Sequence, residues 1–260
     1  MNNTVVIIGV GQLGRVFAGG FLRAGYTVVP VNRSDDMDVV SASHPEPILV
    51  LVAVAEADLE HALSALPPSW KKRAALLQNE LLPRDWERHG ITSPTVLPVW
   101  FEKKKGMGVH TLLPTPIYGP QKETILAALR ALELPCKRIP NKEEMLYELV
   151  RKNLYILTTN IAGLRTGGNV GDLWHQHRDF VLVIQDEVMD VQDWLTGRKN
   201  DRGRLIKGLV EAIEADPAHL CTGRSAVARL ARAIAHADEA KLAVPILREI
   251  QKTAPPPVPT

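Results

Sequence analysis

Three glycines near the N-terminus carry the clearest chemical signal in this chain. Gly9, Gly11 and Gly14 form the pattern GxGxxG, directly after the apolar run at residues 5–8. Between a strand and a helix, the first glycine permits a tight turn and the second lets a pyrophosphate approach the backbone, while the third lets the helix pack closely on the strand. The N–H groups that open the helix would then face the phosphates. We therefore expect a dinucleotide to bind at Gly9, Gly11, Gln12, Leu13 and Gly14.

The residues after the second predicted strand select the type of dinucleotide. An NAD site places an acidic residue there, about 20 residues after the glycines, to bind the ribose hydroxyls. In this chain the strand is followed by Asn32-Arg33-Ser34, and Asp35 and Asp36 come later. The planar guanidinium of Arg33 suits a 2′-phosphate, and Asn32 can add neutral hydrogen bonds. The pattern favours NADP(H), with Asn32 and Arg33 as ligands; the alternative is an exposed arginine that pairs with Asp35 or Asp36.

A third candidate, Asn79, directly follows the buried-strand run Ala74–Gln78. Ligands of an open α/β sheet lie beyond the carboxyl ends of its strands, so Asn79 is expected near a nicotinamide or a substrate. Its amide can both donate and accept hydrogen bonds. An ordinary turn or cap asparagine is the alternative interpretation.

Lys152, Ile156 and Asn160 are spaced i, i+4, i+8 and share one face of a predicted helix. Lys152 and Asn160 would lie ~12 Å apart along the helix axis. A lysine on such a face could donate a proton to a carbonyl oxygen while a hydride arrives at the carbon. The alternative for Lys152 is an ordinary solvated side chain.

The elements that must position these residues alternate between strand and helix in the first half of the chain. Continuously apolar strands are typical of a sheet covered on both faces, and the alternation predicts βαβ units on a mostly parallel sheet. The expected strands are Thr4–Ile8, Thr27–Val31, Ile48–Val54, Ala74–Gln78, Thr95–Phe101 and Gly108–Leu113, with a weaker one at Pro116–Tyr118. The expected helices are Leu13–Ala24, Ala57–Leu66, Arg84–His89 and Lys122–Leu134.

The second half of the chain has apolar residues at helical intervals and no segment with period-two alternation. The expected helices are Glu143–Arg165, Asp179–Leu195, Arg204–Ala215 and Ser225–Ala240. Pro140-Asn141 is a suitable junction, because proline ends the preceding element and asparagine is a good N-cap. The sequence thus predicts an α/β domain over residues 1–140 and an all-α domain over residues 141–260.

Composition narrows the functional class. The chain has 260 residues, with 31 Lys+Arg against 29 Asp+Glu, and this balance gives no footprint for nucleic acid. The chain has no run of about 20 apolar residues that would cross a membrane, and its first residues do not resemble a signal peptide. Two distant cysteines indicate a reducing compartment. His175 and His177 are poorly spaced for a metal. We expect a cytoplasmic protein without a metal ion that acts on a small molecule.

Together these motifs resemble the ketopantoate reductase family, within the superfamily of 6-phosphogluconate-dehydrogenase-like proteins. The resemblance rests on the glycine turn, Asn32-Arg33, Leu77-Gln78-Asn79 and the helix from Arg151-Lys152-Asn153 to Asn160-Ile161-Ala162-Gly163-Leu164. It implies a Rossmann domain followed by an all-helical domain, with the active site in the cleft between them. Members of the family reduce 2-dehydropantoate with NADPH. By this resemblance Arg33 binds the 2′-phosphate, Asn79 lies near nicotinamide and substrate, Lys152 is the general acid, and Asn160 is the second asparagine of the helix.

The chain departs from the family pattern at several places, and a serine pair of the family has no clear counterpart near Cys221-Thr222. Ala55 lies in the segment where a lysine is usual, Ile156 stands in place of the first helix asparagine, and Gly223-Arg224-Ser225-Ala226 lacks a glutamate. Two hypotheses follow: an NADP(H)-dependent oxidoreductase for a small 2-oxo acid or related carbonyl, or a protein that binds NADP(H) without turnover and senses redox state. A reductase for imines within the same superfamily is a narrower option. The apolar helical half leaves a homodimer open.

Overall fold

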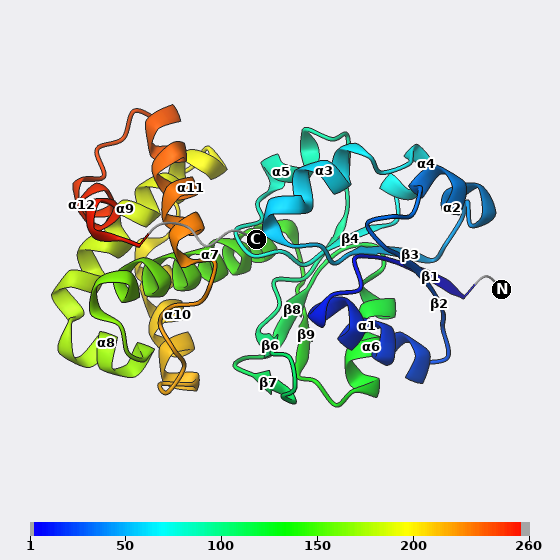
Figure 1. Ribbon diagram of the computed structural model, residues 1–260, viewed down its shortest axis with the longest axis horizontal. Helices are drawn as coiled ribbons and strands as arrows, with labels where there is room; N and C mark the ends of the chain where they lie inside the picture. The colour runs from blue at the N-terminus through cyan, green and yellow to red at the C-terminus, as the bar shows by residue number, and fades with distance from the viewer. Residues whose placement is uncertain (1–2, 256–260) are drawn as a thin grey trace. The chain divides into compact units, whose positions relative to one another are not determined.

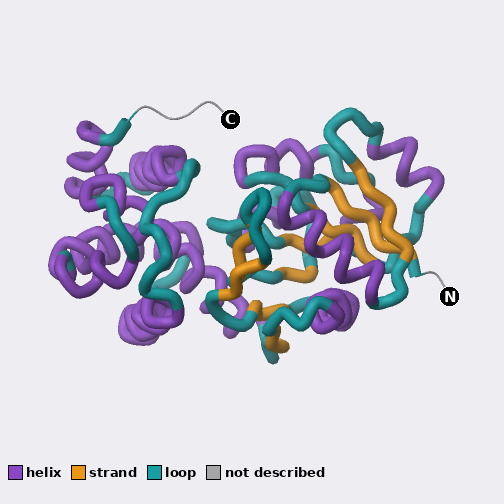
Figure 2. Tube along the Cα trace, turned by 60° about the horizontal axis from the view of Figure 1, so that its bottom comes forward, coloured by secondary structure: helices purple, strands orange, loops and turns teal. Residues whose placement is uncertain are grey.

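The computed structural model describes residues 3–255 and consists of two compact units that divide between Leu149 and Val150. Unit 1 contains the strands, and unit 2 is helical (Figures 1 and 2). The predicted junction at Pro140-Asn141 immediately precedes helix α7 (Lys142–Thr166), and the division falls two turns inside that helix.

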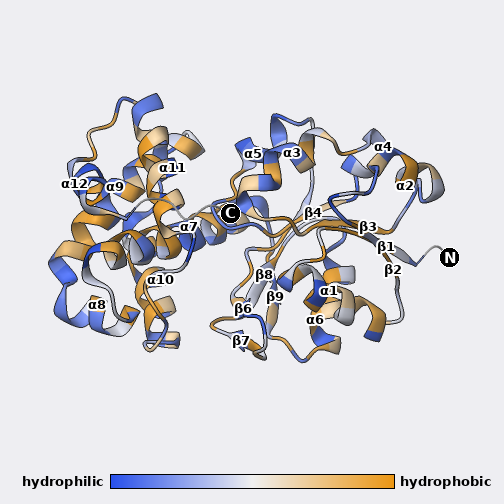
Figure 3. Ribbon diagram, in the orientation of Figure 1, coloured by the Kyte–Doolittle hydropathy of each residue, from blue (hydrophilic) through white to orange (hydrophobic). Residues whose placement is uncertain are grey.

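A five-stranded parallel sheet forms the centre of unit 1. Its strands follow the order β2-β1-β3-β4-β5, as expected for βαβ units. The bounds are β1 Thr4–Ile8, β2 Thr27–Val31, β3 Leu49–Val52, β4 Ala74–Leu76 and β5 Thr95–Val96. Residues 5–8 of β1 and all of β3 are buried, and Figure 3 shows both strands coloured as hydrophobic. This arrangement confirms the predicted α/β fold with a mostly parallel sheet.

Helices cover the two faces of this sheet (Figure 1). On one face lie α1 (Gln12–Arg23) and α6 (Lys122–Ala131), which approach closely because a Cβ at Gly20 would lie 2.6 Å from the Ala128 carbonyl oxygen. On the other face lie α2 (Met37–Ser43), the 3₁₀ turn η1 (Glu56–Asp58), α3 (Leu59–Ser64), α4 (Pro68–Lys71) and α5 (Pro83–Glu87). These layers cover the faces of the sheet, and the carboxyl ends of β1, β2 and β3 border a cavity.

Two small sheets complete unit 1, and one of them corrects the prediction of a single strand over Thr95–Phe101. The chain leaves the main sheet after Val96, and β6 (Phe101–Lys103) pairs with β7 (Val109–Thr111) in a separate antiparallel hairpin. Pro98 lies between the two strands and cannot donate a ladder hydrogen bond. The second small sheet pairs β8 (Thr115–Ile117) with β9 (Cys136–Arg138).

Unit 2 contains most of α7 together with five further helices, which confirms the predicted all-α second half. They are α8 (Val170–Gln176), α9 (Arg178–Thr196), α10 (Arg202–Ala215), α11 (Ala226–Glu239) and α12 (Pro245–Thr253). Buried polar contacts link them. The Arg151 guanidinium donates to the Gly208 carbonyl oxygen, and the Asn153 amide donates to Gln192. Within residues 3–255, no helix is long and apolar enough to span a membrane.

Candidate functional site

The turn between β1 and α1 needs its first and third glycines for structural reasons. Gly9 has a φ of +89°, in the left-handed region that favours glycine, and a Cβ there would lie 3.0 Å from the Ala53 carbonyl oxygen. A Cβ at Gly14 would lie 2.1 Å from the Gly9 carbonyl oxygen, which is sterically impossible without movement of the backbone. These two positions let α1 start directly on the end of β1.

Gly11 has a different role. Among the residues that the structure describes, no heavy atom lies within 4 Å of the position that a Cβ at Gly11 would occupy. Close packing therefore does not require a glycine there. Gly11 is the N-cap of α1 and is exposed, and Gln12 and Leu13 form the first turn. The unpaired amides and the positive end of the helix dipole face this open space, which suits a phosphate group.

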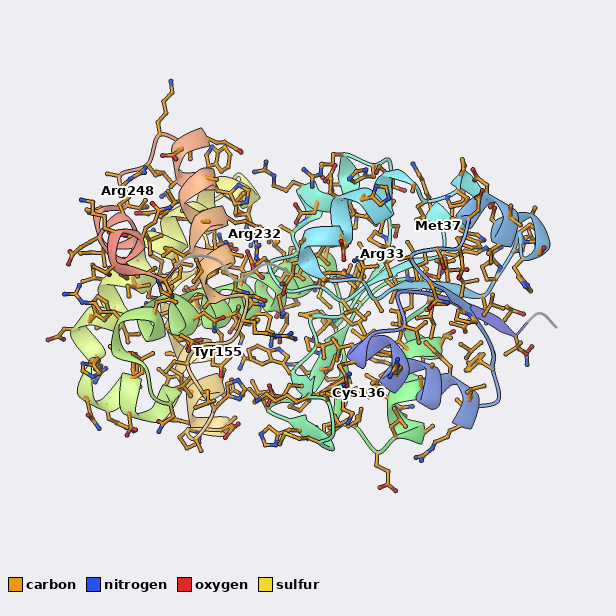
Figure 4. The ribbon with its side chains drawn as sticks, viewed as in Figure 1. Arg33, Met37, Cys136, Tyr155, Arg232 and Arg248 are labelled. Atoms are coloured by element: carbon orange, nitrogen blue, oxygen red, sulfur yellow. The ribbon has the colours of Figure 1, made fainter. Side chains whose placement is uncertain are left out.

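A cavity of about 480 Å³ continues from the glycine turn along the carboxyl ends of β1, β2 and β3. Small apolar residues such as Ala62 line part of the cavity, and charged residues line another part. In Figure 4, the labelled Arg33 and Met37 both belong to the lining. The full lining comprises Ile8, Gly9, Gly11, Val31, Asn32, Arg33, Asp35, Asp36, Met37, Asp38, Ala53, Val54, Ala55, Asp58, His61, Ala62 and Ala65.

The charged groups of this cavity are arranged differently from the sequence-based alternative for Arg33. Arg33 Nη2 lies 3.0 Å from Asp58 Oδ2, and its partner is therefore neither Asp35 nor Asp36. Asp35 instead accepts hydrogen bonds from the backbone N–H and side-chain amide of Asn32, at 2.7 and 3.2 Å. Asp36 caps α2 through the N–H groups of residues 38 and 39.

Asn79 lies at the same edge of the sheet, after β4. Its Nδ2 donates to Glu56 Oε1 at 2.8 Å, which joins the loop after β4 to the loop after β3. The neighbouring Gln78 is buried, and its amide donates to the carbonyl oxygens of Val52 and Val54. Sequence reasoning missed Glu56 and Asp58, whose only signal was their position just beyond a buried strand.

On α7 the predicted trio of residues has two buried members. Lys152 is 7% exposed, with Nζ 5.9 Å from the centroid of the Tyr155 ring (labelled in Figure 4), and Ile156 is also buried. Lys152 is therefore not the ordinary solvated lysine of the alternative interpretation. Asn160 uses both ends of its amide: Nδ2 donates to the Cys221 carbonyl oxygen, and Oδ1 accepts from Arg229 Nη1, each at 2.7 Å.

The Cys221 thiol of unit 2 is unreactive. Burial and the nearby Asp172 carboxylate raise the pKa of the Cys221 thiol to about 11, so the thiol is protonated at neutral pH. Among the residues that the structure describes, no three His, Cys, Asp or Glu side chains gather closely enough to hold a metal ion.

Comparisons with known proteins give matches to solved structures only. No protein-family model and no curated protein matches the sequence. The 2-dehydropantoate 2-reductase from Methylococcus capsulatus is 15% identical, with a TM-score of 0.66 over 96% of this chain and 95% of that chain. D-mandelate dehydrogenase, solved with NADH and anilino(oxo)acetate, is 12% identical, with a TM-score of 0.67 over 96% of both chains. A dimeric ketopantoate reductase from Staphylococcus aureus is 14% identical, with a TM-score of 0.63 over 96% of this chain and 98% of that chain.

These matches extend over nearly the whole length of the chain and of its structural neighbours. The molecule thus has the two-part fold that ketopantoate reductases and this mandelate dehydrogenase share. The resemblance read from the glycine turn, the Asn79 loop and the Lys152 helix is confirmed at the level of the fold.

Proposed function

We propose that this protein is an NADP(H)-dependent oxidoreductase that reduces a small 2-oxo acid or a related carbonyl compound. The observation that carries the proposal is the glycine turn. Gly9 and Gly14 are required by packing, Gly11 is left open, and the space beside it continues into a cavity of about 480 Å³ that ends among charged side chains. A turn that served only to connect β1 and α1 would not need a glycine at the open second position, Gly11.

The residues present fit a phosphate-bearing dinucleotide. Gly9, Gly11 and Gly14 with the first-turn residues Gln12 and Leu13 would hold the pyrophosphate on backbone N–H groups. At the far end of the cavity, Asn32 and Arg33 would bind the ribose and its 2′-phosphate. Asn79 would lie near the nicotinamide and the substrate, with its amide oriented by Glu56.

The bound nicotinamide would supply a hydride to the substrate's carbonyl carbon. The Lys152 ammonium would donate the proton that the developing alkoxide needs; its side chain is buried and lies beside the aromatic ring of Tyr155. Asn79 and Asn160 would hydrogen-bond the substrate. Asn160 is already held between Cys221 and Arg229, which fixes the orientation of its amide.

The assignment is tested by mixing the purified protein with NADPH and a panel of 2-oxo acids and cyclic imines, and following absorbance at the nicotinamide wavelength. We expect NADPH to be oxidised in the presence of at least one 2-oxo acid. Activity with cyclic imines alone would correct the substrate class to imines.

A second candidate, a protein that binds NADP(H) without turnover, is favoured by one feature of α7. Buried Ile156 stands between Lys152 and Asn160 and offers a substrate no hydrogen bond. Tight NADPH binding without oxidation across the whole panel would support this candidate over the reductase.

We also propose a homodimer, since one structural neighbour is described as dimeric. Light scattering coupled to gel filtration tests this directly. A mass near twice the 28.7 kDa of the chain is expected, and a mass of one chain at micromolar concentration would contradict it.

A further inference from the structure

The cofactor cavity contains a carboxylate that competes for its own candidate phosphate ligand. We propose that Asp58 sets the cofactor preference of this protein by competing with the 2′-phosphate of NADP(H) for the Arg33 guanidinium. The proposal rests on the proposed function, since it assumes that a pyridine dinucleotide occupies the cavity.

The geometry puts the two groups in one place. Arg33 follows β2 and Asp58 ends η1, 25 residues later, yet both line the cavity and their side chains meet at 3.0 Å. The Arg33 side chain is 89% exposed and the Asp58 side chain 48% exposed. Pairs this exposed contribute little to stability, so a ligand can exchange for one partner without disrupting the fold.

Of the other lining carboxylates, Asp35 and Asp36 have partners other than Arg33. Asp35 accepts from Asn32, and Asp36 caps α2. Asp58 contacts the arginine itself, and Arg33 is the one Lys or Arg among the lining residues. A 2′-phosphate that binds Arg33 must therefore displace the Asp58 carboxylate. It is also repelled by the negative charge of that carboxylate, which stays nearby.

This arrangement has a definite consequence for specificity. Arg33 attracts the phosphate of NADP(H), while Asp58 opposes that attraction and leaves NAD(H), which lacks the phosphate, unaffected. The preference of the cavity for NADP(H) over NAD(H) then depends on the attraction of the phosphate by Arg33 and on the opposing effect of Asp58. Removal of the Asp58 charge should shift this preference towards NADP(H).

The test is direct titration of the full-length protein with NADPH and with NADH, followed by calorimetry or nicotinamide fluorescence, so that no turnover is needed. In Asp58→Asn we expect the Kd for NADPH to fall roughly tenfold while the Kd for NADH changes less than about threefold. In Arg33→Ala the preference for NADPH over NADH should fall at least about tenfold. When Arg33 is already absent, adding Asp58→Asn should tighten NADPH binding by less than about threefold.

Glu60→Gln is the matched control. Glu60 lies two residues further on, is 57% exposed and pairs with Arg88 outside the cavity, so its loss removes the same charge without touching Arg33. We expect both Kd values to match those of the wild type. Thermal melts confirm that each variant is folded, and Asp58→Ala replaces Asp58→Asn if the latter is not.

The outcomes distinguish a failure of the role of Asp58 from a failure of nucleotide binding itself. Unchanged NADPH affinity in Asp58→Asn, or an equal gain in Glu60→Gln, would overturn the role of Asp58 alone. A loss of NADH affinity with no gain for NADPH would make Asp58 a ribose ligand and also overturn the proposal. If neither nucleotide binds any variant, the proposed function fails together with this inference.

Discussion

Lys152 lies buried on α7, beside the ring of Tyr155. Burying an ammonium group is costly unless the fold or the function compensates for it. A helical lysine that served only solubility would extend into solvent. The burial of Lys152 supports the proposal that it acts as the general acid.

Substitution of Lys152 separates proton donation from charge. Lys152→Ala should lower kcat by about 10²–10⁴-fold, the usual contribution of a general acid, while the Kd for NADPH changes little. Lys152→Arg keeps the positive charge but holds its proton too tightly to donate it, so we expect a similar loss. Stopped-flow reduction of the best 2-oxo acid measures both variants. Near-wild-type turnover in either variant would remove Lys152 from the role of acid.

At the residue scale, the sequence predicted candidates but not their partners. Arg33 pairs with Asp58 and Asn79 with Glu56, across 25 and 23 residues respectively. Local patterns identify the ends of strands, where such residues gather. They do not reveal which side chains meet there, because that depends on how the loops after β2, β3 and β4 fold over the sheet edge.

Among the elements, the β1–α1 turn is where fold and function are most closely joined. The packing of α1 on β1 leaves no space for a side chain at Gly14 and ample space at Gly11. This contrast depends only on what surrounds each Cβ position. A pair of alanine substitutions therefore distinguishes structural from ligand-binding glycines.

Gly14→Ala should lower the free energy of unfolding by about 1–3 kcal/mol, because the added methyl group overlaps the Gly9 carbonyl oxygen and the backbone must move. Gly11→Ala should change stability by less than about 1 kcal/mol, yet weaken nucleotide binding at least about tenfold, because its methyl group enters the space of the pyrophosphate. Urea unfolding and nucleotide titration measure the two effects. Equal nucleotide affinity in Gly11→Ala and the wild type would contradict this assignment of the open space.

In unit 2, a buried carboxylate holds the start of the last helix. Glu187 on α9 accepts hydrogen bonds from the N–H groups of Ile246 and Leu247, each at 2.9 Å, in the first turn of α12. Glu187→Ala removes both bonds and leaves the two donors without this acceptor, so we expect a loss of about 2–4 kcal/mol. Hydrogen exchange should show early opening of α12. Unchanged protection of residues 246 and 247 would refute the capping role.

The elements themselves were predictable to different degrees. The bounds expected for β1 and β2 match the structure, because each is a β-branched run between turn residues. Helix α2 was missed because it buries no residue and so has no apolar stripe, and its signal was the cap Asp36. Strand β9 has three residues and little burial, and it owes its conformation to pairing with β8 rather than to its own sequence.

At the scale of the whole molecule, stability against acid depends in part on Asp193, a carboxylate whose pKa is depressed in the folded state. Burial alone would raise the pKa of Asp193, but hydrogen bonds from Asn200 and the nearby Lys199 ammonium outweigh it and hold the pKa below its usual range. A carboxylate with a lowered pKa in the folded state stabilises the protein above the pKa that it has when unfolded. This contribution is lost as the pH falls through the folded-state value.

Asp193→Asn should therefore destabilise the protein by about 1–3 kcal/mol at pH 7, with a smaller difference from the wild type as the pH falls below about 4. Asp186→Asn is the control, since Asp186 is 65% exposed and forms its ion pair with Arg202, at 3.4 Å, rather than with Lys199. Urea denaturation at a series of pH values measures both variants. A difference that stays constant down to pH 3 would contradict the argument.

The central claim about the molecule is that a phosphorylated pyridine dinucleotide binds across the glycine turn of unit 1. Calorimetric titration of the full-length protein with NADPH, repeated with Gly11→Ala, tests it most directly. We predict saturable binding of one nucleotide per chain in the micromolar range or tighter, weakened at least about tenfold in the variant. No detectable heat with NADPH or NADH at millimolar concentration would contradict the account.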